Sequence, residues 1–290
     1  MKRITLLALS LSFIFSFGLS AQTAYVSATA SGSGDGTSWE NAYTELQAAL
    51  DDETATEVWV ATGIYSTAAV GRDSLAVYTI TRPLNLYGGF AGTESAIEDR
   101  DIAANVTTLS GDIAGDDLPD DVSTNRTDNS FHILYVDSLL TTPVVVDGIT
   151  FSGGQSAGTN NSLLRNRSGA GVLALSTVNV SNCTFTNNFA FSGAGVYLIF
   201  GASNSVVENC TFTKNTATSQ SAGVMMNTLS NVQVRNCVFD DNTTNRGVVY
   251  PLFSDNISIS NCLFINNNNN DGFSAGIFNW QSTNFKLSDC

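Results

Sequence analysis

The sequence predicts an all-β protein that winds into a right-handed parallel β-helix, a solenoid of about 25–28 residues per coil with a short N-terminal capping helix. A four-residue motif, Asn-Cys-x-Phe, recurs through the second half, and successive cysteines of the series lie 27, 27, 25 and 28 residues apart. A period in the twenties without a helical pattern inside it is typical of a solenoid. The motif stands at Asn182–Phe185, Asn209–Phe212, Asn236–Phe239 and Asn261–Phe264, and an Asp-Cys pair begins it again at Asp289.

Each motif follows a short run in which apolar and polar residues alternate, as in Val178–Val180 and Val232–Val234. Such alternation indicates a β-strand with one buried face. An asparagine stands three positions after each phenylalanine, and a small-residue stretch such as Gly193–Tyr197 follows it. We therefore expect about three short strands per coil, separated by turns.

Stacking the coils in register, roughly 4.8 Å apart, places every Cys above a Cys and every Phe above a Phe. Each buried Phe then contributes about 1.5–3 kcal/mol to stability. The Asn before each Cys is expected at a turn, with left-handed backbone and a side-chain bond to the Asn of the next coil. Stacked cysteines have parallel Cβ directions, which suit a disulfide poorly, so we expect all five to be free thiols.

The N-terminus is typical of a secretory signal peptide, predicted to comprise residues 1–21. A basic start, Met1–Arg3, precedes the apolar run Ile4–Leu19 and the small residues that end at Ala21. No later stretch is apolar for long enough to cross a membrane. We expect a secreted, extracellular protein or one displayed on the outer-membrane surface.

Residues 22–75 are predicted to form the N-terminal cap and the first coil. The segment Thr44–Gln47 matches a capping box, which opens a short helix with Leu46, Ala49 and Leu50 on one face. A helix laid across the open end of a β-helix would hide its unpaired first strand.

Irregular coils with an acidic loop insertion are expected over residues 76–168, and regular repeats over residues 169–290. A loop from Gln155 to Arg167 is expected to project from the coil, and loops of this kind often carry function. Because the chain stops inside its motif at Cys290, we expect the repeats to be truncated at the C-terminus.

The formal net charge of −14 resides in the front half of the chain. Residues 1–150 contain 20 acidic and 6 basic side chains, whereas residues 151–290 contain 6 of each. Nucleic acid is therefore not an expected partner, because phosphate contacts need clustered Lys and Arg.

The acidic insertion is a candidate Ca²⁺ site, since Ca²⁺ takes six to eight oxygen ligands and favours clustered carboxylates. The spacing lacks the pattern of an EF-hand, and a merely solvated acidic loop is the alternative. No other cofactor is expected. The candidate ligands are Asp112, Asp116, Asp117, Asp120 and Asp121.

Two sets of segments carry a family resemblance. The Phe-x-x-Asn and Gly-Ala-Gly-Val segments, the latter at residues 193–196, resemble the paired repeats of chlamydial polymorphic outer-membrane proteins, whose passenger parts are adhesive β-helices. From about Tyr25 onward, including Leu86–Glu94 and Leu109–Ile113, the chain is similar to bacterial secreted right-handed parallel β-helix repeat proteins with a pectin-lyase-like fold. The resemblance implies the fold over nearly the whole chain.

Exposed aromatic and basic side chains on the coils are candidate contacts for a sugar or another surface. By the alternation rule, at least half of the aromatic candidates belong to the core instead. The basic candidates fall one per coil and could align on one side, or only keep the surface soluble. The aromatic candidates are Tyr197, Phe200, Tyr250 and Trp280, and the basic ones are Lys214, Arg235 and Arg246.

We expect a β-helix scaffold that is adhesin-like or glycan-binding, with a polysaccharide or a host or neighbouring cell surface as its partner and without catalysis of its own. The alternative is a polysaccharide lyase or glycoside hydrolase acting on an acidic polysaccharide, with a site completed beyond residue 290. A purely structural spacer is the third possibility. Asp240 and Asp241 are adjacent and make a poor catalytic pair unless they lie in a turn, and the single histidine, His132, is expected to be structural.

Overall fold

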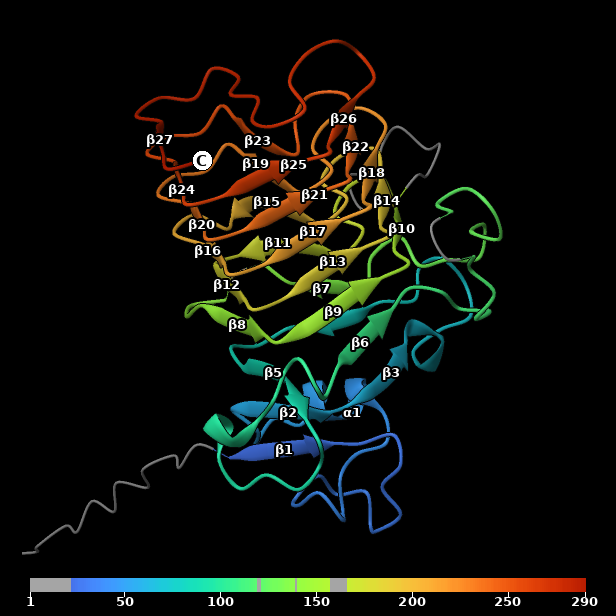
Figure 1. The fold of residues 1–290 in the computed structure, drawn as a ribbon. Coiled ribbons are helices and arrows are strands. Elements are labelled where there is room, and N and C mark those ends of the chain that lie inside the picture. The colour runs from blue at the N-terminus through green and yellow to red at the C-terminus, as the bar shows by residue number, and fades with distance from the viewer. Residues whose placement is uncertain (1–21, 119–120, 139, 157–165) are drawn as a thin grey trace, which may run out of the picture.

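The computed structural model describes residues 22–118, 121–138, 140–156 and 166–290. Its strands pair only in parallel and stack into a column of coils, from β1 at one end to β27 at the other (Figure 1). This confirms the predicted all-β parallel β-helix. The predicted signal peptide, Asp120 and most of the Gln155–Arg167 loop lie outside the described residues.

Four parallel sheets run along the column, named A to D here. Sheet A contains β1 (Thr23–Val26), β2 (Glu57–Ala61), β5 (Asn85–Phe90), β8 (Val144–Asp147), β12 (Val178–Ser181), β16 (Val206–Glu208), β20 (Gln233–Arg235), β24 (Ser258–Ser260) and β27 (Lys286–Ser288). Sheet B contains β3 (Gly63–Ser66), β6 (Thr107–Ser110), β9 (Ile149–Ser152), β13 (Thr184–Thr186), β17 (Thr211–Thr213), β21 (Val238–Asp240) and β25 (Leu263–Ile265).

The other two sheets complete the coil. Sheet C contains β4 (Tyr78–Ile80), β7 (Leu134–Val136), β11 (Val172–Ser176), β15 (Val196–Gly201), β19 (Val224–Asn227) and β23 (Val249–Leu252). Sheet D contains β10 (Gln155–Ser156), β14 (Phe189–Ala190), β18 (Thr216–Ala217), β22 (Thr243–Thr244) and β26 (Asn268–Asn269). Two 3₁₀ turns, Thr67–Ala69 and Ile97–Asp99, interrupt the front coils.

From β8 onward the chain visits sheets A, B, D and C in turn. The regular coils therefore contain four strands rather than the expected three. The additional one is the two-residue strand of sheet D, which is too short to show an alternating pattern in the sequence.

The interior is a stack of identical side chains, as the repeat predicts. Phe151, Phe185, Phe212, Phe239 and Phe264 form a continuous column with ring centroids 4.8–5.0 Å apart and nearly parallel planes. Offset aromatic pairs add about 0.5–1.5 kcal/mol each to the burial of the rings. The column therefore fixes the register between successive coils.

The asparagines before the cysteines have left-handed backbone, with φ of 53–54° at Asn182, Asn209, Asn236 and Asn261, as predicted. The expected bond between successive asparagines joins Asn236 Nδ2 to Asn209 Oδ1 at 3.2 Å, whereas Asn182 Nδ2 donates to Asp147 Oδ2 at 2.8 Å. The cysteines are free thiols, also as expected, and Cys183, Cys210, Cys237 and Cys262 are buried. Burial raises the pKa of the Cys210 thiol.

A second asparagine ladder lies inside the coil, at the turn between sheets B and D. Asn188, Asn215 and Asn242 each donate from Nδ2 to Oδ1 of the next asparagine, the last being Asn267, at 2.9–3.0 Å. The first three are completely buried. These are the asparagines that follow each phenylalanine by three positions in the sequence.

Helix α1 (Leu46–Asp51) covers the first coil, and its buried residues are the predicted Leu46, Ala49 and Leu50. The predicted capping box is wrong, because Glu45 is the N-cap and makes no side-chain capping bond. The Gln47 side chain is used elsewhere: its Oε1 accepts from Thr79 N at 2.9 Å and its Nε2 donates to Thr79 O at 3.1 Å. The amide thus occupies the place of a neighbouring strand beside β4.

In the described part of the chain, no helix has the length and apolarity needed to span a bilayer.

Candidate functional site

Sheet C carries an apolar row on its outer face, separate from the core of the coil. Strand pairing sets Leu173 beside both Tyr135 and Tyr197, then Tyr197 beside Met225 and Met225 beside Tyr250. All five side chains are at most 6% exposed. Preceding turns lie against three of them: a Cβ added at Gly169 would lie 2.9 Å from Leu173 Cβ, and one added at Gly193 would lie 2.9 Å from Tyr197 Cβ and 3.1 Å from Met225 Cβ.

This arrangement corrects two of the predicted contacts. Tyr197 is 3% exposed, and its hydroxyl accepts a hydrogen bond from Asn227 Nδ2 at 2.9 Å. Burial raises the pKa of the Tyr197 phenol. Tyr250 is completely buried. Neither ring can offer its face to a ligand, although both point away from the coil interior.

At the far end of the row, three aromatic residues surround Phe278, and we call Tyr250, Phe273, Phe278 and Trp280 the Phe278 cluster. The Phe278 centroid lies 5.3 Å from that of Tyr250, 5.4 Å from that of Phe273 and 6.0 Å from that of Trp280. Trp280 is 43% exposed and Phe273 is 55% exposed. The buried Tyr250 thus supports a layer of rings that reaches solvent.

Arg246 joins the same cluster, since its guanidinium carbon lies 5.7 Å from the Phe273 centroid. The structure therefore brings three predicted residues together: Arg246, Tyr250 and Trp280. Sequence reasoning missed Phe273 and Phe278. The signal was the alternating pair Phe278-x-Trp280, which follows Tyr250-x-Leu252 one coil later.

The basic candidates do not align on one side of the coil, which corrects that expectation. Arg235 belongs to β20 in sheet A, where its Nε lies 2.7 Å from Glu208 Oε2. Lys214 occupies a left-handed turn between β17 and β18, with φ of 55°. Arg246 lies between β22 and β23. Phe200, the remaining aromatic candidate, is 63% exposed at the end of β15, outside the Phe278 cluster.

The carboxylates of the repeats do not converge either. Asp240 ends β21 and accepts from Asn266 Nδ2 at 2.9 Å, while Asp241 follows it in a left-handed turn. Asp255 lies between sheets C and A, where Asn284 Nδ2 donates to it at 2.8 Å. Hydrogen bonds from the side chains of Thr283 and Asn284 lower the pKa of Asp255.

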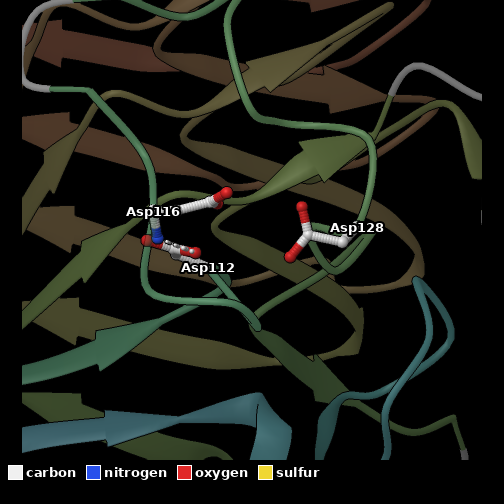
Figure 2. A group of neighbouring side chains, drawn as sticks. All are labelled: Asp112, Asp116 and Asp128. Carbon is white, nitrogen blue, oxygen red and sulfur yellow. Dashed lines mark hydrogen bonds between the residues drawn. The ribbon is translucent and has the colours of Figure 1, made fainter.

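In the acidic loop, three carboxylates face a common space: those of Asp112, Asp116 and Asp128 (Figure 2). One oxygen of each lies within 4.8 Å of the others. The turn holds Asp112 in place, because its carboxylate accepts from the amides of Gly115 at 2.7 Å and Asp117 at 3.1 Å. The three could supply part of the oxygen shell of a Ca²⁺ ion, which prefers ligands of this type.

The other predicted Ca²⁺ ligands are placed differently. Asp117 pairs with Arg126 Nη1 at 3.2 Å, and burial raises the pKa of Asp117. Asp121 caps its own turn by accepting from Ser123 N at 2.7 Å, and the Ser123 hydroxyl lowers the pKa of Asp121. Asp120 lies outside the described residues. Asp128, near the end of the acidic loop, takes their place in the group.

Arg126 anchors the acidic loop to the coil. Only 2% of its side chain is exposed, and it donates to Asn187 O at 2.8 Å and to Gly154 O at 3.3 Å. Gly154 stands where the later repeats have their buried asparagine, and its N–H donates to Asn188 Oδ1 at 3.0 Å. An arginine from the insertion therefore completes the turn that lacks its own asparagine.

Comparison with curated proteins gave no match, and comparison with solved structures gave none either. A family model described as a right handed beta helix region matches residues 128–290, which is more than half of the chain. That segment contains the four-sheet coils, the phenylalanine column and both asparagine ladders. On this match and its parallel coil architecture, the chain belongs to the right-handed β-helix family.

Proposed function

We propose that the protein is a secreted or surface-displayed scaffold that binds glycans in the manner of an adhesin and has no catalytic activity of its own. The observation that carries the proposal is the continuation of the outer aromatic row of sheet C into the Phe278 cluster, where the Trp280 ring stacks on Phe278 at an interplanar angle of 26° and Arg246 lies over Phe273. The predicted signal peptide supports export.

The chemistry of the cluster suits a sugar. A pyranose ring has an apolar face of C–H groups, which gains dispersion energy against an aromatic ring. Arg246 beside Phe273 adds donors for hydroxyl or ring oxygens. Because the rings rest on a sheet paired by backbone hydrogen bonds, little ordering is needed when a ligand binds.

Such a site is small, so its affinity for one sugar is expected to be weak. Adhesion would then depend on many copies acting together on one surface, which raises the effective concentration of each contact.

A polysaccharide lyase or hydrolase remains the alternative. Hydrolysis by two carboxylates needs them about 5–10 Å apart across the scissile bond. Asp240 and Asp255 are instead placed at different corners of the coil. The observed grouping of rings therefore favours binding over cleavage.

The test is retention of the protein, from Gln22 onward, on immobilised neutral and acidic polysaccharides, with assays for newly released reducing or unsaturated ends. We expect retention without product, and at least a fivefold loss of retention for Trp280→Ala. Ile64→Ala is the matched control, because Ile64 is an exposed apolar residue, 74% exposed, on sheet B. Release of product would establish the enzyme alternative, and equal loss in both variants would remove the Phe278 cluster from the proposal.

A further inference from the structure

A pocket of about 370 Å³ opens on the outer face of sheet C, at the opposite end from the Phe278 cluster. Thr79 of β4 and Tyr135 of β7 are paired neighbours on its floor. Its described lining residues are Ser74, Leu75, Val77, Thr79, Phe131, His132, Tyr135, Asp137 and Asn166. The volume lies in the range of small-molecule sites, which combine apolar walls with a few placed polar groups.

The polar groups of the pocket are held in fixed positions. Tyr135 donates its hydroxyl to Asp137 Oδ1 at 3.1 Å, and Ser138 N donates to the same oxygen at 2.7 Å. His132 is 6% exposed, and its Nδ1 lies 2.9 Å from Gly169 O. Since a carbonyl oxygen can only accept, Nδ1 is the donor. A ligand would therefore meet a preorganised lining.

The charge of the lining selects the class of ligand. Among the described lining residues, Asp137 is the one acidic side chain, with a formal negative charge. Asp137 would repel an anionic ligand such as a uronate, and none of the described lining residues is a Lys or Arg that could bind it. A neutral sugar can donate hydroxyls to Asp137 and place its C–H face against Tyr135 or Phe131.

We propose that this pocket binds one neutral pyranose unit of a glycan. The assignment rests on the proposed glycan binding, but it concerns a separate subsite. Along the outer row, five strand steps separate Tyr135 from Phe278, which is roughly 24 Å at about 4.8 Å per step. A single sugar unit cannot reach both places, so the two subsites can fail independently.

The first experiment uses His132 as a reporter, because it is the only histidine in the sequence. The tag-free chain from Gln22 onward is titrated with methyl glycosides of glucose, galactose and mannose, and with galacturonate, while the imidazole Hε1 signal is followed by NMR. We expect a saturable shift with at least one neutral glycoside and none with galacturonate at the same concentration. Absence of any shift, or an equal shift with galacturonate, would overturn the assignment.

The second experiment fills the pocket. Thr79→Phe places a ring on its floor and is expected to weaken the glycoside that shifts His132 by tenfold or more. Thr186→Phe is the matched control, since Thr186 is a half-buried threonine on the outer face of β13. Unchanged binding by a folded Thr79→Phe variant would contradict the proposal, and if that variant does not fold the wild-type titration decides.

The two proposals give different patterns. Retention on polysaccharides that depends on Trp280, without a shift of His132, would leave the proposed function standing and remove this subsite.

Discussion

Asn215 uses every hydrogen-bonding group of its buried amide. Its Nδ2 donates to Phe185 O at 2.8 Å and to Asn242 Oδ1 at 3.0 Å, and its Oδ1 accepts from both nitrogens of Asn188, at 3.0 and 3.1 Å. A buried amide satisfied in this way adds specificity at little cost, whereas a break in the ladder leaves several groups without partners.

Replacement of Asn215 by Ala is therefore expected to destabilise the protein by at least about 3 kcal/mol, since each stranded buried group costs about 1–3 kcal/mol. Urea unfolding monitored by circular dichroism measures the loss. Asn179→Ala is the control, because Asn179 points outward from β12 and should change stability by less than about 0.5 kcal/mol. Similar midpoints for the two variants would show that the ladder is not a major source of stability.

Charge repulsion within the acidic loop gives a second prediction at this scale. Asp116 is exposed, and its carboxylate lies close to those of Asp112 and Asp128. Without Ca²⁺, Asp116→Asn should leave the melting temperature unchanged or raise it by a few degrees, because one like charge is removed.

We expect CaCl₂ to raise the melting temperature of the wild type more than that of Asp116→Asn, because the variant has one carboxylate fewer to bind Ca²⁺. Asp99→Asn, an exposed acidic residue of the Ile97–Asp99 turn, is the control and should respond like the wild type. Equal responses of all three proteins would exclude Ca²⁺ binding through Asp116.

Among the elements, α1 has a role that its length alone does not explain. Six residues make a helix that would be marginal in water. It is stabilised by burying Leu46, Ala49 and Leu50, and in return Gln47 satisfies the free edge of β4. An unpaired strand edge is a template for aggregation, so the helix protects the first coil.

Gln47→Ala is expected to cost about 1–3 kcal/mol and to speed hydrogen exchange in the peptide that contains Thr79, because Thr79 N loses its acceptor. Exchange followed by mass spectrometry measures this locally. Glu45→Gln is the control, since Glu45 is the exposed N-cap of the same helix and makes no side-chain capping bond. Faster exchange in the control as well would mean that the helix frays as a whole.

For the whole molecule, the uneven charge predicts a response to salt. The net charge of −14 belongs to the front half, where acidic residues repel one another at neutral pH. The Debye length falls from roughly 30 Å at 0.01 M salt to about 8 Å at 0.15 M, which screens this repulsion. We expect the melting temperature to rise by a few degrees between these two NaCl concentrations at pH 7. A fall would indicate that favourable ion pairs such as Arg235 with Glu208 outweigh the repulsion.

The repeat predicts the molecule best where one coil copies another. Phe185 stacks on Phe212, and Asn209 turns the chain at positive φ. Both follow from the repeat, because a residue that recurs once per coil lies next to its equivalent in the neighbouring coil. The prediction is poorer outside the repeat. Thr44 and Gln47 match the local pattern of a capping box, yet the Gln47 side chain hydrogen-bonds to the backbone of Thr79, which is 32 residues away in the sequence.

By itself, the sequence determined the parallel coils, the interior stacks, the free thiols and the asymmetry of charge, since all of these follow from periodicity and composition. The tertiary structure alone decided which outward residues are exposed. Tyr197 is 3% exposed and Trp280 is 43% exposed; Tyr197 is paired with Leu173 and Met225, one on each side, whereas Trp280 bridges Leu252 on one side. It also decided that Asp117 pairs with Arg126 while Asp128 joins Asp112 and Asp116. These outcomes depend on contacts between segments that do not share the repeat, so the periodic pattern of the sequence cannot predict them.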